Sequence, residues 1–117
     1  MKRLAYGLLF LGAAGGAFYI AGFGAWQVWF FAVAPDLTFI FAGGPDLQKG
    51  QINPRAVPLY NAAHSLIGPA LLAALVLVFV GRGPWLAAAL AWSAHIAADR
   101  TIGFGPRTRE GFQRGAA

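Results

Sequence analysis

Four long apolar segments, separated by short polar or glycine-rich stretches, dominate the pattern of the chain. They cover residues 4–23, 25–41, 58–80 and 84–102. A helix needs about 20 largely apolar residues to cross a bilayer, so the pattern predicts four transmembrane helices. Residues 43–57 are then a polar loop and residues 103–117 a tail. We therefore expect residues 1–117 to form a single all-α domain, a compact bundle of four transmembrane helices.

Proline and glycine modify two of these segments. Pro35 lacks a backbone N–H and disfavours helical geometry at Ala34, so the second segment is expected to kink or break there. Gly12 and Gly16 are four residues apart and predict a close helix contact for the first segment. The first segment also has the charged start, apolar run and small-residue exit of a signal peptide. That interpretation is an open alternative to a first span.

Composition and charge support the membrane class and predict an orientation. The chain is 58% hydrophobic and 11% charged, with a mean hydropathy of +0.59, whereas soluble domains carry about 25% charged residues. With four spans, Arg82 lies on one side of the membrane. Positively charged loops stay in the cytoplasm, so we expect a multi-pass protein of the bacterial inner membrane with both termini cytoplasmic. The basic residues on that side are Lys2, Arg3, Lys49, Arg55, Arg107, Arg109 and Arg114.

Several classes of function are excluded by what the sequence lacks. It contains no cysteine, which rules out disulfides, iron–sulfur clusters and thiol nucleophiles. It has no phosphate-binding loop, dinucleotide fingerprint, HExxH or GxSxG motif. The net charge of +5 is explained by membrane topology, and no basic stripe alternates with stacking aromatics. We therefore expect contact with the lipid bilayer and none with nucleic acid.

The polar residues inside the apolar segments are the candidates for function. Tyr60 and His64 are four residues apart, as are His95 and Asp99, so each pair shares one helix face. At 1.5 Å per residue, His64 lies about 9 Å inside its span, and His95 and Asp99 lie about 10 and 5 Å from the end of theirs. Asp36, just after the Pro35 break, lies at a similar depth. Antiparallel packing therefore predicts that these four side chains meet near the cytoplasmic face.

Two imidazoles with carboxylates suit a divalent metal such as zinc or manganese. We expect His64, His95 and Asp99 as metal ligands, with Asp36 completing the catalytic group. A bound metal lowers the pKa of water to about 7, so hydrolysis of a lipid or a phosphate ester is one concrete reaction. Arg100 or Arg55 would hold the phosphate. Supporting polar contacts are expected from Tyr60, Asn61 and Ser65.

Structural explanations of the same residues stand beside this one. His64 would simply hydrogen-bond Tyr60 or a carbonyl, and Asp36 would cap the segment after Pro35. Arg100 would extend to the headgroups. On this view the chain is a non-catalytic accessory subunit of a larger membrane complex, respiratory or photosynthetic, or a homo-oligomer. A histidine ligand to haem, or a contact to a pigment or quinone, is a variant of that view.

Five motifs occur in order along nearly the whole chain: PDL (35–37), AGGP (42–45), YNAAHS (60–65), AHIAADRTIGFG (94–105) and GF (111–112). With them the chain resembles the small bacterial four-helix membrane proteins of domain-of-unknown-function family 4260. The resemblance implies four spans but no established activity. The polar loop is longer and the tail differs from the family pattern.

A looser resemblance concerns membrane-bound metal-dependent hydrolases with polar residues in the order PDxD, HS and HxxxD. Asp36, His64, His95 and Asp99 match those positions in this chain. Thr38 occupies the place of the second aspartate of PDxD. As an analogy, the resemblance implies hydrolysis at a metal held by these residues.

Overall fold

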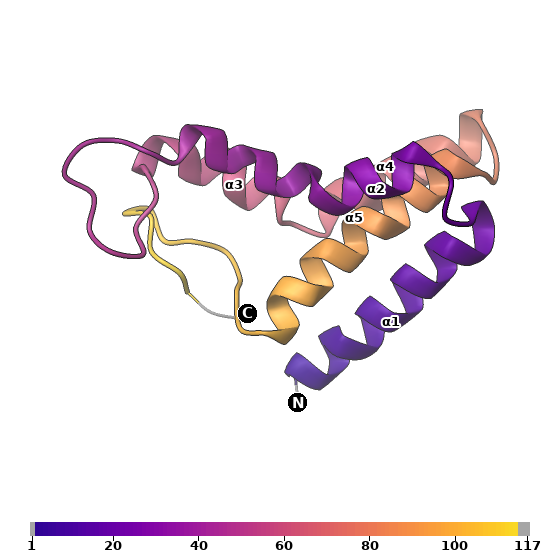
Figure 1. The fold of residues 1–117 in the computed structure, drawn as a ribbon, viewed down its shortest axis with the longest axis horizontal. Helices are drawn as coiled ribbons and strands as arrows, with labels where there is room; N and C mark the ends of the chain where they lie inside the picture. The colour runs from indigo at the N-terminus through magenta and orange to yellow at the C-terminus, as the bar shows by residue number, and fades with distance from the viewer. Residues whose placement is uncertain (1, 115–117) are drawn as a thin grey trace.

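A computed structural model of the protein describes residues 2–114, in which helices are connected by turns, a loop at residues 42–53 and a non-helical tail from residue 102 (Figure 1). The all-α class expected from the sequence is confirmed for these residues, which contain one isolated β-bridge, between Arg107 and Gln113, and no strand. The helices in order are α1 (Lys2–Ala21), α2 (Trp26–Val33), the 3₁₀ helix η1 (Ala34–Phe41), the 3₁₀ turn η2 (Pro54–Ala56), α3 (Val57–Ala63), α4 (Ile67–Phe79) and α5 (Pro84–Thr101).

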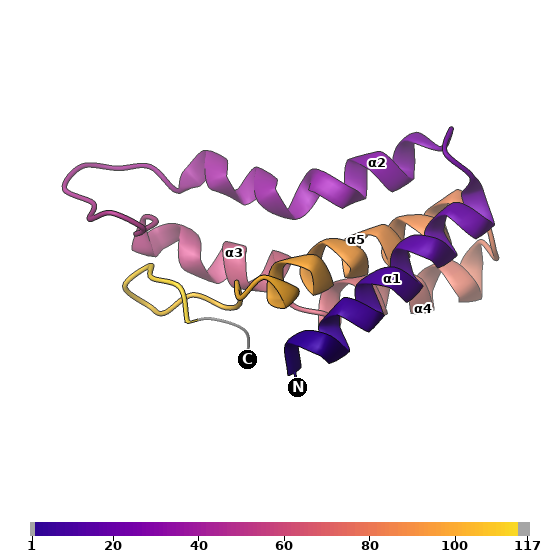
Figure 2. The same cartoon turned by 60° about the horizontal axis from the view of Figure 1, so that its bottom comes forward.

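Helix α5 lies at the centre, in contact with α1, α2 and α4 (Figure 2). Alanine fills the packed faces, which lets neighbouring backbones approach closely. On α1, the residues buried against the bundle are Ala13 and Ala17. Gly16 also faces α5, with Leu90 beside it, whereas Gly12 has no atom near it. The predicted close helix contact is therefore confirmed for Gly16 and wrong for Gly12. The buried alanines of α5 are Ala87, Ala88, Ala89, Ala91, Ala94 and Ala97.

The second apolar segment changes its geometry at the predicted position. It is α-helical as far as Val33 and continues as a 3₁₀ helix from Ala34. Pro35 cannot donate the N–H that would continue the α-helical pattern, and its ring restricts the residue before it. The proline therefore rewinds the helix more tightly without ending it.

The third apolar segment is not one helix but two, α3 and α4, bent by 43° at a break of three residues. Pro69 explains the position of the break. In a continuous helix the carbonyl of Ser65 would accept from residue 69, which has no N–H, and the proline ring would clash with that carbonyl. The chain forms a turn instead, in which Gly68 N–H donates to Ser65 O at 3.2 Å.

After α5 the tail folds back against the loop before α3. Gly111 has φ +104° and its carbonyl accepts from Ile52 N–H at 3.0 Å. Asn61 of α3 forms two hydrogen bonds with the backbone of Arg107. Its Oδ1 accepts from Arg107 N–H at 2.7 Å, and its Nδ2 donates to Arg107 O at 3.0 Å. These contacts bring the tail beside the end of α3.

The membrane expectation is met only in part. Among the described residues, α1 is long and apolar enough to cross a membrane, and Pro54–Ala63 with α4 would make a second span if the bent pair counts as one. Only 11% of the α1 span is buried inside the protein. Large apolar side chains such as Leu11 and Phe79 are exposed.

Candidate metal centre

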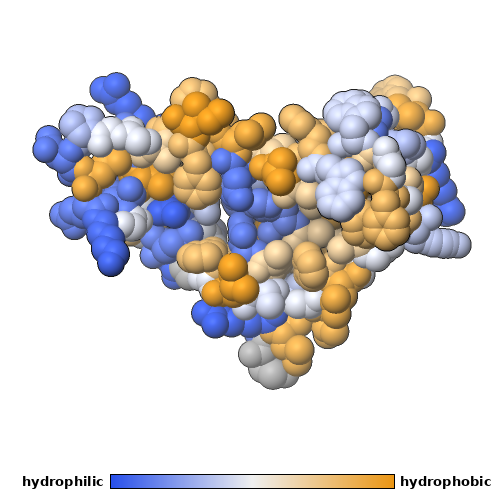
Figure 3. All heavy atoms as spheres, viewed as in Figure 1, coloured by the Kyte–Doolittle hydropathy of each residue, from blue (hydrophilic) through white to orange (hydrophobic). Residues whose placement is uncertain are grey.

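Four side chains far apart in the sequence converge at one point. Asp36 comes from η1, His64 from the end of α3, and His95 and Asp99 from adjacent turns of α5. One ligand atom from each lies within 4.8 Å of all the others. The convergence expected from helix spacing and antiparallel packing is therefore observed. Hydrophilic residues gather in the middle of a largely apolar face as well as at one end (Figure 3).

Both imidazole rings are oriented by backbone carbonyls. His64 Nδ1 lies 2.8 Å from Tyr60 O, and His95 Nδ1 lies 2.6 Å from Ala32 O. A carbonyl can only accept, so each Nδ1 carries the proton and each Nε2 is free for another partner. This arrangement, with the second ring nitrogen held by a carbonyl, is typical of metal-binding histidines.

Pro35 leaves the carbonyl of Ala32 without a helical partner, and this carbonyl is the acceptor for His95. In the 3₁₀ pattern the carbonyl of Ala32 would pair with the N–H of residue 35, and proline has none. The carbonyl is therefore available, and the His95 ring fills the vacancy from α5. The same proline that tightens η1 thus orients one of the two histidines.

The two Nε2 atoms and two carboxylate oxygens alternate around the centre. Asp36 Oδ1 lies 3.2 Å from His64 Nε2 and 3.1 Å from His95 Nε2. Asp99 Oδ2 lies 3.6 and 3.3 Å from the same two atoms. An unprotonated Nε2 and a carboxylate oxygen are both acceptors, so these contacts require a proton or a cation between them.

The spacing fits a cation of the size of zinc. Ligand atoms about 2.0–2.1 Å from a tetrahedral metal lie about 3.3–3.4 Å from one another. The four nitrogen–oxygen distances, from 3.1 to 3.6 Å, bracket that value. Two carboxylates also balance the charge of a divalent ion, and imidazole with carboxylate is a donor set that zinc and manganese accept. The residues therefore fit a divalent metal.

The break before α4 leaves carbonyls that α5 satisfies. Trp92 Nε1–H donates to Ala63 O at 2.7 Å, and Arg100 Nη2 donates to His64 O at 3.3 Å. Both carbonyls would have accepted helical N–H groups if α3 had continued into α4. The end of α3 is thus held by two donors on α5, one to Ala63 and one to His64, in addition to the ring contact of His64.

The other predicted site residues have different surroundings. Arg100 also donates to Tyr6 Oη at 3.0 Å, which ties α1 to the centre. Arg55 lies in a separate depression beside Phe41 and Leu59. The sequence suggested both arginines as phosphate contacts, and neither lines the two larger cavities that border the cluster.

The three supporting residues are divided between the centre and its surroundings. The Tyr60 ring stacks on His64 with centroids 4.0 Å apart, and its carbonyl orients that ring. Asn61 holds the tail through Arg107, as described above. Ser65 Oγ accepts from Ile67 N–H at 3.3 Å and so assists the start of α4.

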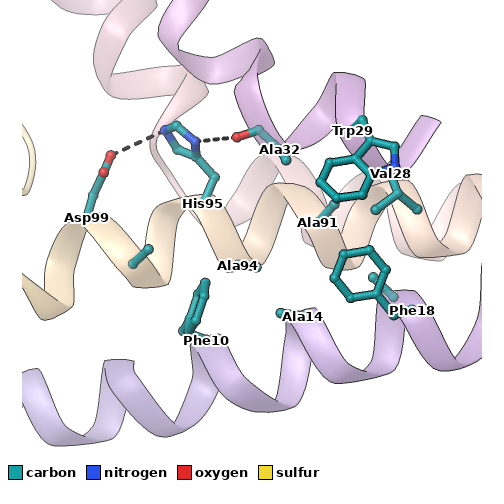
Figure 4. A pocket seen from close by; sticks show the side chains of 12 residues that line it. Phe10, Ala14, Phe18, Val28, Trp29, Ala32, Ala91, Ala94, His95 and Asp99 are labelled. Atoms are coloured by element: carbon teal, nitrogen blue, oxygen red, sulfur yellow. Dashed lines mark hydrogen bonds and ion pairs between the residues drawn. The ribbon is translucent and has the colours of Figure 1, made fainter. Parts of the chain in front are cut away.

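Of the spaces that border the cluster, two have room for a ligand, and sequence reasoning missed the residue that distinguishes them. An apolar cavity of about 290 Å³ ends at His95 and Asp99 (Figure 4). A smaller cavity of about 160 Å³ is lined by Asp36, Asp99 and Arg107, among others. Arg107 was predicted only as a charge of the tail. Its position depends on the tail folding back onto α3, for which no local pattern exists.

Comparison with known proteins assigns a family and no activity. Residues 3–116 match the family described as "Domain of unknown function (DUF4260)". This match confirms the family resemblance inferred from the motifs. No curated protein and no solved structure matches the chain.

Proposed function

We propose that this chain, which belongs to the family of unknown function DUF4260, is a metal-dependent hydrolase embedded in a membrane. The observation that supports this proposal is the arrangement of the two histidines. Their Nδ1 atoms are occupied by carbonyls, and their Nε2 atoms face two carboxylate oxygens at 3.1–3.6 Å. A purely structural contact would not require a carbonyl to fix the Nδ1 atom of each ring so that both Nε2 atoms face the same point.

Differences in exposure favour a division of roles among the four residues. The His64 and His95 side chains are 5% and 10% exposed, and Asp99 is 26% exposed. Asp36 is the most open, at 49%. Catalytic zinc sites use three protein ligands and keep one position for water. We assign His64, His95 and Asp99 as ligands. Asp36, the most exposed of the four, would leave the fourth position to water and act as the general base.

The reaction that this assignment supports is hydrolysis of an ester, either carboxylic or phosphoric. A divalent metal in the site would supply a water molecule whose pKa is near 7. Asp36 would accept a proton from the attacking water, while the water oxygen bonds to the carbonyl carbon or the phosphorus of the ester. The bond between that atom and the alcohol oxygen then breaks, and the alcohol leaves with the proton from Asp36.

Length and exposed surface support insertion in a membrane through all four apolar segments. α2 and η1 together extend about 28 Å and α5 about 27 Å, close to the 30 Å hydrocarbon core. Most of the large apolar side chains on α1 and α4 are exposed, among them Leu8, Leu11, Leu71 and Phe79. In water such a surface would cost about 25 cal/mol for each Å². A bilayer removes that cost.

The distribution of ends and turns is consistent with cytoplasmic termini. The turn at residues 22–25, between α1 and α2, and the turn at residues 80–83, between α4 and α5, lie at one end of the molecule. The described N-terminus, the loop after η1 and the tail lie away from that end (Figure 1). The basic residues of the tail and loop would then contact the anionic headgroups of an inner membrane. Arg82 lies in one of the two short turns.

Metal analysis of purified variants tests the proposal. The wild-type protein is expected to bind one zinc or manganese ion per chain, and Asp99→Asn should lose it. Asp36→Asn should keep the ion but lose hydrolysis of carboxylic and phosphate ester probes. Asp46→Asn is the matched control, since Asp46 is exposed and has a φ of 60° that asparagine tolerates.

A protein without metal would overturn the proposal. If neither ion binds and Asp99→Asn changes only stability, the cluster is a structural ion pair between protonated histidines and aspartates. The chain would then be better explained as an accessory subunit or homo-oligomer, which size measurements on the solubilised protein would identify.

A further inference from the structure

The cluster of His64, His95, Asp36 and Asp99 lies between two cavities whose linings differ. Asp99 lines both of them, His95 lines the larger and Asp36 the smaller. A ligand that reaches the cluster can therefore extend in two directions at once. The chemistry of each cavity defines one part of that ligand.

The larger cavity is a groove for an apolar chain. It runs from His95 between α1 and α2, along α5, and Figure 4 shows Phe10 and Phe18 of α1 facing it with Trp29 of α2. Apart from His95 and Asp99 at its end, its lining is alanine, valine and aromatic. A hydrocarbon chain is the ligand that such a wall accommodates without leaving polar groups unpaired.

The smaller cavity offers a fixed positive charge. Arg107 Nη1 donates to Gly50 O at 3.0 Å and to Gly111 O at 2.9 Å, and the guanidinium lies 5.1 Å from the Tyr60 ring centroid. These contacts hold the group in place without neutralising it. Among the described residues Arg107 forms no ion pair, although Asp36 and Asp99 line the same cavity.

The guanidinium also has an unused donor. Arg107 Nε is buried and has no hydrogen-bond partner in the described structure. An unpaired donor on a charged group is costly, and an anion is the partner that a guanidinium binds most strongly. A bound anion beside this group would also face the metal that the carboxylates hold.

We propose that the substrate is an anionic amphiphile, with a phosphate group between Arg107 and the metal and a hydrocarbon chain in the groove lined by Phe10, Phe18 and Trp29. This inference rests on the proposed metal-dependent hydrolase. It replaces Arg100 and Arg55 as the phosphate contact. Arg100 borders a space beside His64 and Asp99 that has almost no accessible volume, and Arg55 lies in a separate depression.

Binding of three probes to the zinc-loaded wild-type protein tests the inference. The protein is placed in phosphatidylcholine nanodiscs, and nanodiscs without protein correct for partitioning into lipid. Dodecyl phosphate carries both features, butyl phosphate lacks the long chain and dodecanol lacks the phosphate. Dodecyl phosphate should bind at least about tenfold more tightly than either, since dodecanol lacks the charge-assisted contact and butyl phosphate lacks most of the chain that the groove would bury.

Two variants separate the cavities, and each has a matched control. Arg107→Gln should weaken dodecyl phosphate at least about tenfold, while Arg109→Gln, at an exposed arginine two residues later, should not. Ala14→Leu fills the groove and should weaken dodecyl phosphate but not butyl phosphate. Ala5→Leu, on an exposed face of α1, should weaken neither.

Zinc content is measured in every sample, so the two proposals fail differently. If the wild type binds no metal, the hydrolase proposal is overturned together with the inference built on it. If zinc is bound but dodecyl and butyl phosphate bind equally, the chain site is overturned alone. Equal effects of Arg107→Gln and Arg109→Gln would overturn the phosphate site. If Arg107→Gln does not fold, the relative affinities of the wild-type protein for the three probes still test the inference.

Discussion

Substitution of Gly68 by alanine should disturb the proposed metal centre from a distance, through Trp92. Gly68 is the second residue of α4, and a methyl group built there would lie 2.6 Å from Cζ2 and Cη2 of the Trp92 ring. Carbon atoms in contact are separated by about 3.5–4.0 Å, so the ring must retreat by about 1 Å. Its Nε1–H bond to Ala63 O, now 2.7 Å, would then be lost.

The expected magnitudes follow from that displacement. Insertion of a methyl group into a tightly packed contact lowers the free energy of unfolding by about 1–3 kcal/mol. Ala63 directly precedes His64, whose ring must keep its Nε2 within about 0.2 Å of a ligand position. Loss of such an outer contact typically lowers metal affinity about 10–100-fold. We expect a similar loss of zinc affinity in Gly68→Ala.

Zinc affinity by chelator competition, with thermal unfolding in the same detergent, measures both effects. The control is Gly12→Ala, because no atom lies within 4 Å of a methyl group at that position. Alanine is the better helix former, so this control should bind zinc normally and be no less stable. The coupling between Trp92 and His64 is refuted if Gly68→Ala binds zinc as tightly as the wild type.

Two further substitutions test contacts around the centre. Asn61→Ala removes both hydrogen bonds to the Arg107 backbone, so trypsin should cleave the tail faster at low enzyme concentration, with zinc content unchanged; equal cleavage rates would contradict the role assigned to Asn61. Tyr6→Phe removes the 3.0 Å contact to Arg100 and should lower the free energy of unfolding by about 1 kcal/mol in urea titration, whereas an unchanged midpoint would show that the contact contributes nothing.

The candidate ligands could be predicted from the sequence because their positions depend on regular geometry. His95 and Asp99 share a face through the period of the helix, and antiparallel order brings them to the level of His64. Asp36 followed from its place after the Pro35 break. Each step used only helix rise, helix period and the order of the segments, which sequence spacing defines.

The groups that complete the centre could not be predicted in this way. The carbonyl groups of Ala32 and Tyr60 orient the rings. Because every residue has a backbone carbonyl, the sequence does not indicate which carbonyls take this role. Arg107 reaches its cavity through contacts 46 residues apart in sequence with Asn61. The division of the third segment into α3 and α4 did have a signal, because Pro69 removes a helical donor, but the uninterrupted apolar run obscured it.

The break between α3 and α4 makes the order of chain synthesis matter for the centre. The carbonyls of Ala63 and His64 obtain their donors from Trp92 and Arg100, which are translated about 30 residues later. Until α5 docks, those carbonyls have no protein partner, and burying them would cost free energy. His64 can therefore acquire its final position only when the last helix is in place. A nascent chain that stops before α5 contains Asp36 and one of the three predicted ligands, His64, but no preformed centre.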